Sequence, residues 1–269
     1  MIRKAGVEMK TIVVDEKNRS FVQKNSQQNV MALGFFDGVH KGHQKVIRRA
    51  KEIAINRDLP LAVMSFFPHP KTVFSNQEID YLMPMEEKAE QLKGLGVDIF
   101  YIIEFTKSFA SLKPEEFVHD YLVKLNVKQA VVGFDYTYGK KGAGNIHSIA
   151  RHSQFQIEVE VVEEYKMFGS KVSSTELRDL LQNGQMEAMT ELLGRPYQIK
   201  HSFKEGVASY YTLPGNGWYY VTVIFGRRMI SQVIYVRDRK TISISRDLPC
   251  KECTIIFHQR VTNQEQVIS

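Results

Sequence analysis

The sequence predicts an α/β protein in two parts, in which a mostly parallel sheet covered by helices precedes a small antiparallel β domain. Apolar runs of strand length alternate with segments of helical spacing up to residue 184. After Pro196 the helical spacing stops, and β-branched and aromatic residues dominate. The whole net charge of +6 falls on residues 195–269, which hold eleven Lys and Arg against five Asp and Glu. We therefore expect one domain over residues 1–184 and a second over residues 185–269, joined at "LLGRPYQ".

The composition bounds the class of protein. The chain has 269 residues, of which 43% are hydrophobic and 25% charged, as in ordinary globular proteins. Its start lacks the apolar stretch of a secretory signal, and no apolar run approaches the ~18 residues of a membrane span. Cys250 and Cys253 are the only cysteines, so we expect a reducing, cytoplasmic setting. With His258 they give too few ligands for a structural zinc site, and we expect no metal held by the protein alone.

Strand and helix patterns follow one another in order along the first domain. The predicted strands cover residues 30–36, 61–67, 98–105, 129–134 and 155–165. The predicted helices cover residues 40–56, 85–95, 113–125 and 173–184, the last opened by Ser173 or Ser174 and closed by Gly184. In the second domain, turns at "PGNG" and "GRR" separate the strands of an antiparallel meander.

Two predicted strands end in glycine-containing loops. The first ends near Gly34 and the fourth near Gly133. Ligands of a parallel sheet bind beyond the carboxyl ends of its strands. We therefore expect both loops to open into one crevice.

The segment "GFFDGVHKGH" (residues 34–43) places two histidines where a strand passes into a helix. A helix start attracts phosphate through its unpaired N–H groups and its dipole, and residues three apart share one helix face. His40 and His43 can therefore point at one polyphosphate, while Gly42 leaves room for a nucleotide and Asp37 fixes the loop. The pattern favours nucleotidyl transfer, in which imidazole donors stabilise charge on the phosphates. A metal pair and two surface histidines are the alternatives.

A second segment, "KVSSTELR" (residues 171–178), gathers hydroxyl groups at another helix start. Ser174 and Thr175 lie in its first turn, and Arg178 follows one turn later. Hydroxyls, backbone N–H groups and a guanidinium suit a second contact with phosphates. The alternative is an ordinary helix cap with Glu176 in the first turn.

Together these segments resemble the prokaryotic FAD synthetase family, whose members usually join an N-terminal FMN adenylyltransferase to a C-terminal riboflavin kinase. Four segments carry the resemblance in order: "GFFDGVHKGH", "FFPHP", "VVGFDYTYGKKGAGN" and "VSSTELR". "LLGRPY" is similar to the junction between the two halves. The resemblance spans residues 31–197 and implies a Rossmann-like nucleotidyltransferase domain followed by a β-barrel-like domain.

The resemblance implies roles for individual residues. The implied catalytic residues are His40, His43 and Arg178. The implied ATP-binding residues are Gly34, Phe36, Asp37, Gly42, Ser174 and Thr175. The implied FMN-binding residues are Pro68, His69, Pro70, Gly133, Asp135, Tyr136 and Tyr138, in a region where aromatic side chains suit a flat isoalloxazine ring. The implied substrates are ATP, with Mg²⁺, and FMN, and the implied products are FAD and pyrophosphate.

The second domain departs from the family's kinase half. That half carries a "G-x-P-T-A-N" motif for magnesium and nucleotide, a later "N-x-G-x-R-P-T" segment and an acidic base, and none has a counterpart here. The 73 residues after Pro196 are also few for a kinase half. The resemblance therefore implies a degenerate, shortened kinase half and an enzyme that makes FAD but not FMN.

Two other functions stay open on the sequence alone. One is a bifunctional enzyme that also phosphorylates riboflavin, and the other is a flavin-responsive regulator whose basic tail binds RNA. The tail's aromatic residues, among them Trp218, fit the core and edges of a β domain better than a nucleic-acid platform. Nucleic acid is thus not the favoured partner, although the basic tail leaves it open. The sequence does not determine an oligomeric state.

Overall fold

The computed structural model describes residues 8–75, 79, 81–202, 204–239, 241–244 and 251–261. The chain divides into two compact units. The first, here called the sheet unit, comprises Met1–Phe36, Gly42–Ile79 and Ala89–Tyr165. The second, here called the barrel unit, comprises Asp37–Lys41, Asp80–Lys88 and Lys166–Ser269. A single domain boundary after residue 184 stays a prediction.

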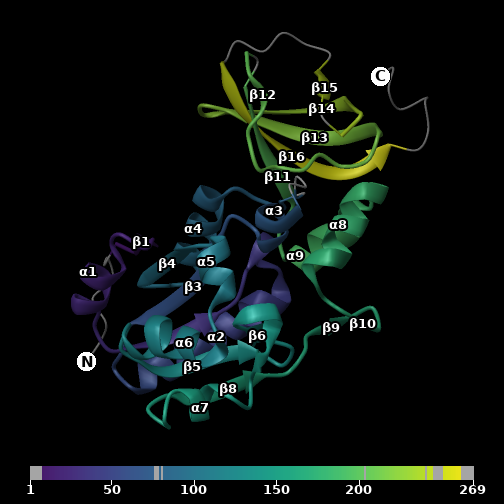
Figure 1. Cartoon of the computed structure of the whole chain (residues 1–269). Helices are drawn as coiled ribbons and strands as arrows, with labels where there is room; N and C mark the ends of the chain where they lie inside the picture. The colour runs from purple at the N-terminus through teal and green to yellow at the C-terminus, as the bar shows by residue number, and fades with distance from the viewer. Residues whose placement is uncertain are drawn as a thin grey trace. The chain divides into compact units, whose positions relative to one another are not determined.

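The sheet unit is built on a six-stranded parallel sheet (Figure 1). Its strands are β1 (Lys10–Val14), β2 (Asn29–Leu33), β3 (Leu61–Phe67), β4 (Ile99–Glu104), β5 (Val127–Gly133) and β8 (Glu158–Val162). The strands lie in the order β1-β4-β3-β2-β5-β8. The chain therefore runs outward from β2 through β3 and β4 and then restarts on the other side of β2 at β5. Such a reversal of strand order is where parallel sheets bind ligands.

Helices and short hairpins connect these strands. The helices are α1 (Arg19–Lys24), α2 (Lys41–Asn56), α3 (Pro70–Ser75), α4 (Met85–Gly94), α5 (Lys107–Ser111), α6 (Pro114–Phe117) and α7 (Ile149–His152). The hairpin strands are β6 (Thr137–Tyr138) and β7 (Gly144–Asn145). Helix α2 buries Val46, Ile47, Ala50, Ile53 and Ala54, the helical spacing read from the sequence. Strand β2 is buried along its whole length, as a central parallel strand covered on both faces should be.

The barrel unit contains a second six-stranded sheet, which is antiparallel and barrel-like (Figure 1). Its strands are β11 (Tyr197–Ser202), β12 (Gly206–Val207), β13 (Gly217–Phe225), β14 (Arg228–Arg237), β15 (Thr241–Ile244) and β16 (Glu252–Val261). The hairpin strands β9 (Lys166–Met167) and β10 (Ser170–Lys171) and the helices α8 (Ser174–Asn183) and α9 (Met186–Leu193) precede the sheet. Tyr219, Val221, Ile255 and Phe257 are fully buried and form its core.

Most predicted elements are present, with differences that have local causes. The first strand ends at Leu33 rather than residue 36, because the chain leaves the sheet and Phe36 takes a positive φ of 52°. The helix expected over residues 113–125 consists of α6 and a π-helical turn over Val118–Val123. The meander is confirmed for β13, β14 and β15, but β16 returns to lie between β11 and β13.

Two further expectations concern a membrane span and the cysteine pair Cys250 and Cys253. Within the described ranges, no helix is both long and apolar enough to cross a bilayer. Cys253 is buried on β16, whereas Cys250 lies outside the described residues.

Candidate active site

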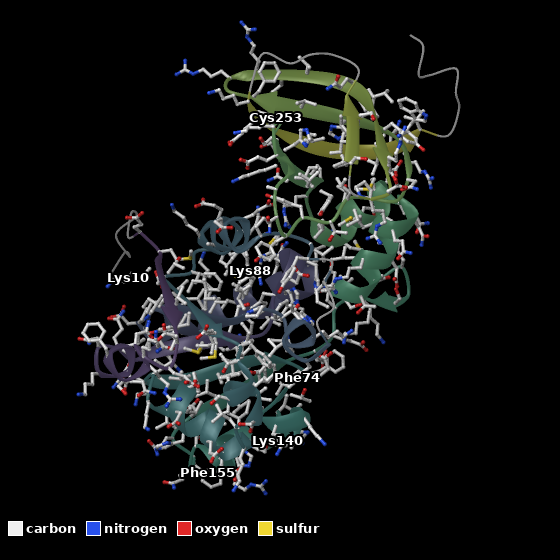
Figure 2. All side chains as sticks on the ribbon, turned by 45° about the horizontal axis from the view of Figure 1, so that its top comes forward. Lys10, Phe74, Lys88, Lys140, Phe155 and Cys253 are labelled. Carbon is white, nitrogen blue, oxygen red and sulfur yellow. The ribbon has the colours of Figure 1, made fainter. Side chains whose placement is uncertain are left out.

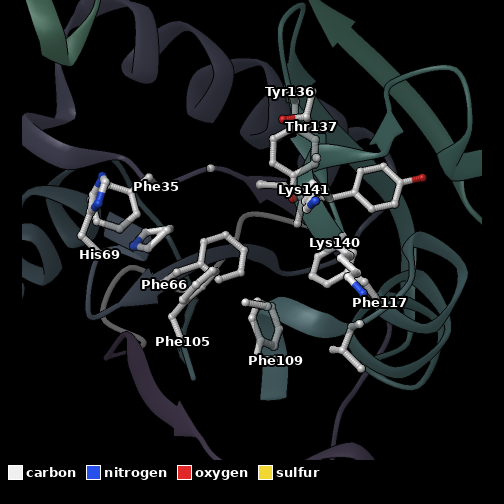
Figure 3. A pocket seen from close by; sticks show the side chains of 18 of the residues that line it. Phe35, Phe66, His69, Phe105, Phe109, Phe117, Tyr136, Thr137, Lys140 and Lys141 are labelled. Atoms are coloured by element: carbon white, nitrogen blue, oxygen red, sulfur yellow. The ribbon is translucent and has the colours of Figure 1, made fainter. Parts of the chain in front are cut away.

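A cavity of about 710 Å³ opens in the sheet unit beyond the carboxyl ends of β2 and β5 (Figure 3). Residues from the loop after β2, including Gly34 and Phe36, line one part of it. Residues from Gly133 to Gly142, after β5, line another part. The prediction that these two loops share one crevice is therefore confirmed.

Aromatic side chains form the walls of this cavity (Figure 3). Phe109 lies at the centre of a cluster in which its ring centroid is 5.7 Å from Phe66, 5.3 Å from Phe105 and 6.0 Å from Phe117. The hydroxyl of Thr106 caps α5 by accepting a hydrogen bond from the Phe109 N–H at 3.0 Å, which fixes the backbone that carries this ring. Flat aromatic walls of this kind suit a large planar ligand.

One edge of the cavity is basic. Lys107, Lys140 and Lys141 belong to its lining. The loop that carries the last two is held close to α6, since the Lys140 N–H donates to the Leu112 carbonyl at 2.7 Å. Gly139 makes this approach possible, because its φ is +72° and a Cβ atom there would lie 2.8 Å from the Pro114 backbone. An apolar cavity with a basic edge favours a planar ligand that carries a negative charge.

The structure places the residues predicted to bind FMN as follows. The cavity lining includes His69, Pro70, Gly133, Asp135, Tyr136 and Tyr138. Pro68 is not part of the lining, although it directly precedes His69, whose ring packs edge-on against Phe35 at 4.5 Å. The Tyr138 hydroxyl is already engaged with Ser148 and His152, both at 2.9 Å, so its ring is a fixed part of the wall.

His43 lies in the first turn of α2 and lines the same cavity. Its ring packs edge-on against Phe36 at 5.2 Å. Phe36 is 1% exposed, and a Cβ atom on Gly34 would lie 2.9 Å from its ring. Gly34 and Phe36, both predicted to bind ATP, thus also fix the position of the His43 ring.

His40 belongs to the barrel unit and directly precedes α2. It is 4% exposed, and burial together with the nearby Lys171 lowers its pKa to about 4. Its imidazole is therefore neutral near pH 7 and has one N–H to donate. The segment before it has an unusual backbone, with φ +79° at Gly38 and +44° at Val39.

Asp37 anchors this segment inside the barrel unit. Its carboxylate accepts a hydrogen bond from Arg178 at 2.5 Å and from the Leu82 N–H at 3.2 Å. The Ser174 hydroxyl donates to the Asp37 carbonyl at 3.0 Å. Burial raises the pKa of Asp37, while the positive charges of Lys88 and Arg178 oppose that rise.

The second predicted phosphate segment forms the start of α8. The Ser173 hydroxyl caps the helix by accepting from the Glu176 N–H at 3.2 Å, and Gly184 ends it in a left-handed conformation. Thr175 is exposed in the first turn. The Arg178 guanidinium lies on Asp37 and also donates to the Ser174 carbonyl at 3.2 Å. Its direct contact with phosphate stays a prediction.

Sequence reasoning missed Lys88, which lies in the first turn of α4. Its side chain is 1% exposed and is surrounded by other side chains (Figure 2). Burial lowers the pKa of Lys88 to about 8, and the charge of Asp37 acts against this. In the sequence, "MEEKAEQL" is indistinguishable from an exposed helix, so only the folded chain identifies this lysine. The phenylalanines around Phe109 were also missed, because they come from separate elements, and the basic loop "GKKG" was missed although its two lysines are visible in the sequence.

Comparison with known proteins gives the family. Residues 22–176 match the FAD synthetase family. A bifunctional riboflavin kinase/FMN adenylyltransferase of Listeria monocytogenes is 47% identical over 179 residues, which are 66% of this chain and 57% of that protein. A FAD synthetase of the same organism is 32% identical over 227 residues, which are 82% of this chain and 89% of that protein.

A solved structure shares the fold over most of the chain. The crystal structure described as a macrolide-efflux protein from Streptococcus pneumoniae superposes with a TM-score of 0.82 and 26% identity over 94% of this chain and all of that chain. The present chain thus shares its fold with a protein of that description, while it spans little more than half of the bifunctional relative. From the matched residues and the relatives together, the chain belongs to the FAD synthetase family.

Proposed function

We propose that the chain transfers the AMP group of ATP to FMN and releases FAD and pyrophosphate. The observation that carries this proposal is the aromatic cavity with its basic edge at the point where the strand order reverses. A flavin ring fits flat walls, and the phosphate of FMN fits a lysine edge. The names of the relatives from Listeria monocytogenes support the same activity.

The reaction forms one phosphoanhydride bond and breaks another. A phosphate oxygen of FMN attacks the α-phosphorus of ATP. The bond from that phosphorus to the oxygen leading to the β-phosphate breaks, and pyrophosphate leaves with the electron pair. Such a step needs positioning and charge stabilisation rather than a covalent intermediate.

The two histidines supply hydrogen-bond donors to this charge. His43 lines the flavin cavity and so is assigned to the reacting phosphates beside FMN. His40, with its pKa lowered to about 4, acts as a neutral donor to an ATP phosphate and not as a cation. Ser174 and Thr175, at the start of α8, are assigned to ATP as well.

Magnesium enters this proposal as part of the substrate. Within the described ranges, no group of three or more His, Cys, Asp or Glu side chains could hold a metal ion. Mg²⁺ bound to nucleotides is held largely by phosphate oxygens and water. We therefore assign MgATP as the form of the substrate. We also propose a cytoplasmic location, because ATP is made and used there.

We further propose that the barrel unit has no riboflavin kinase activity. No "PTAN" motif occurs anywhere in the sequence, and no acidic residue stands in the context of a base. The FAD synthetase of Listeria monocytogenes, which carries only the one activity in its name, is matched over 89% of its length. A barrel can persist without its former chemistry, because fold and site are separable.

Incubation of the purified chain with MgATP and FMN, followed by chromatography, tests the activity. FAD and pyrophosphate should appear in equal amounts. His43→Ala should lower the turnover by roughly 10²- to 10³-fold, as for one lost transition-state donor. The matched variant His147→Ala, at an exposed histidine, should leave turnover unchanged. A folded wild-type chain that forms no FAD would overturn the proposal.

A further inference from the structure

Within the barrel unit, residues 211 and 212 precede β13 and contact residues 81–88. Residues 81–88 in turn form hydrogen bonds with Asp37. The Thr212 hydroxyl donates to the Tyr81 carbonyl at 2.7 Å. The Tyr211 hydroxyl donates to the Glu87 carboxylate at 2.5 Å. Thr212 is 6% exposed and Glu87 8% exposed, so water does not readily replace these partners.

The core of the β sheet fixes this segment in turn. Tyr197, the first residue of β11, is 3% exposed and donates its hydroxyl to the Thr212 carbonyl at 2.7 Å. Its ring packs against Phe257 of β16 at 6.3 Å. Thr212 is therefore held by the sheet on one side and holds Tyr81 on the other.

Residues 81–88 then contact Asp37 directly. The Leu82 N–H donates to both carboxylate oxygens of Asp37, at 3.2 and 3.3 Å. A Cβ atom on Gly38 would lie 2.9 Å from the Leu82 side chain, so this side chain packs directly against the Gly38 backbone. Lys88 adds a buried positive charge that interacts with Asp37.

The segment Asp37–His40 needs such support. Val39 is β-branched and has a positive φ of 44°, a conformation that persists only when the surroundings impose it. Arg195, at the junction before β11, adds one more contact by donating to the Gly38 carbonyl at 3.0 Å. After residue 184, Arg195 thus contacts this segment directly, and Tyr211 and Thr212 support it through residues 81–88.

We propose that the β domain is retained because it positions the Asp37–His40 segment, with Thr212 and Tyr211 as the positioning residues that act through residues 81–88. This role rests on the proposed function, because it gives the β domain, residues 185–269, a part in adenylyl transfer although that domain has no recognisable site of its own. Neither residue touches substrate in this proposal. Both act on His40 through Leu82, Lys88 and Asp37.

Hydrogen exchange on the full chain tests the positioning without reference to activity. Thr212→Val keeps the side-chain shape and removes the hydroxyl, whereas Thr212→Ser keeps the hydroxyl. Thr222→Val is the matched control, because the Thr222 hydroxyl on β13 makes a comparable hydrogen bond, to His258 at 2.8 Å, and that bond does not involve residues 81–88. Amide exchange is measured in peptides that cover residues 36–41 and 81–88.

Thr212→Val should accelerate exchange roughly three- to tenfold in both peptides, the effect of one lost hydrogen bond. Thr212→Ser and Thr222→Val should leave both peptides unchanged. Acceleration in residues 81–88 alone, or equal acceleration in Thr222→Val, would overturn the inference. Because exchange does not depend on catalysis, this result is independent of whether the wild-type chain forms FAD.

Kinetics then separate positioning from loss of folded protein. Tyr211→Phe combined with Thr212→Val should raise the KM for ATP several-fold and leave the KM for FMN unchanged. A merely structural role would lower only the concentration of active enzyme and leave both KM values unchanged, which would contradict the inference. Absence of FAD formation by the wild-type chain would contradict the proposed function instead.

Discussion

His40 shows how burial sets the chemistry of a single residue. An imidazole in water titrates near pH 6.5. Here burial, and then the charge of Lys171, lowers the pKa of His40 to about 4. The side chain is therefore neutral at the pH where ATP carries its full charge. A neutral donor avoids the cost of a buried imidazolium while ATP is absent.

The same shift predicts how stability depends on pH. The unfolded chain binds a proton at His40 below about pH 6.5, whereas the folded chain does so only near pH 4. The folded state therefore loses roughly 3 kcal/mol at this residue as the pH falls from about 6.5 to 4. Urea unfolding across this range should show the loss in the wild type and in His147→Gln, an exposed control. It should be absent from His40→Gln, and an identical pH profile for His40→Gln would contradict the assigned pKa.

Asp37 and Arg178 form a pair whose energetics can be measured directly. Asp37 is 1% exposed, and Arg178 donates to it at 2.5 Å. Removing Arg178 leaves the buried Asp37 carboxylate with the charge of Lys88 alone, so its burial is less well compensated. Arg178→Met should lower the free energy of unfolding by about 3 kcal/mol, and combination with Asp37→Asn should cost about 1–2 kcal/mol less than the sum of the single changes. Arg151→Met, at an exposed arginine of α7, is the control, and strictly additive single effects would contradict the pairing.

At the scale of elements, the flavin cavity joins walls and a basic edge from separate parts of the chain. β3, α5 and α6 each supply a phenylalanine, and the loop after β6 supplies Lys140 and Lys141. The lysines should act on the phosphate of FMN and not on its ring. We therefore expect separate determinants for flavin binding and for phosphate recognition in this cavity.

Substitution of the two lysines tests this separation. The double variant Lys140→Ala, Lys141→Ala should raise the KM for FMN about tenfold, the effect of one lost charge-assisted contact. Riboflavin lacks the phosphate, so its inhibition constant as a competitor of FMN should not change. Lys200→Ala, at an exposed lysine of β11, is the control. Equal weakening of FMN and riboflavin binding would show that the loop shapes the cavity and does not recognise the phosphate.

The elements differ in how far the sequence predicts them. The turn from β2 into α2 is predictable because its determinants are local, with a buried run, glycines and helical spacing within residues 30–56. The aromatic cluster around Phe109 is not predictable from the sequence. Phe66 of β3, Phe105 after β4 and Phe117 of α6 meet only when these elements pack together. Lys88 has no local signature at all, since its burial depends on tertiary contacts.

In the molecule as a whole, the β domain also shows that the sequence predicts local elements better than long-range strand pairing. Local turns predicted the meander of β13, β14 and β15, but the pairing of β16 with β11 and β13 joins residues far apart in sequence. The retention of the β domain is explained by the contacts of Tyr211 and Thr212 with residues 81–88. The basic residues after 194 leave nucleic acid open as a partner on charge alone, although it is not the favoured one.

This chain should adenylylate FMN and should not phosphorylate riboflavin. Parallel incubations of the purified chain with MgATP and either FMN or riboflavin test this expectation most directly, with flavins separated by chromatography. FAD and equimolar pyrophosphate should form from FMN, and neither FMN nor FAD should form from riboflavin. Stoichiometric FMN from riboflavin, abolished by substitutions in residues 197–269 alone, would contradict it by demonstrating a kinase site in the barrel unit.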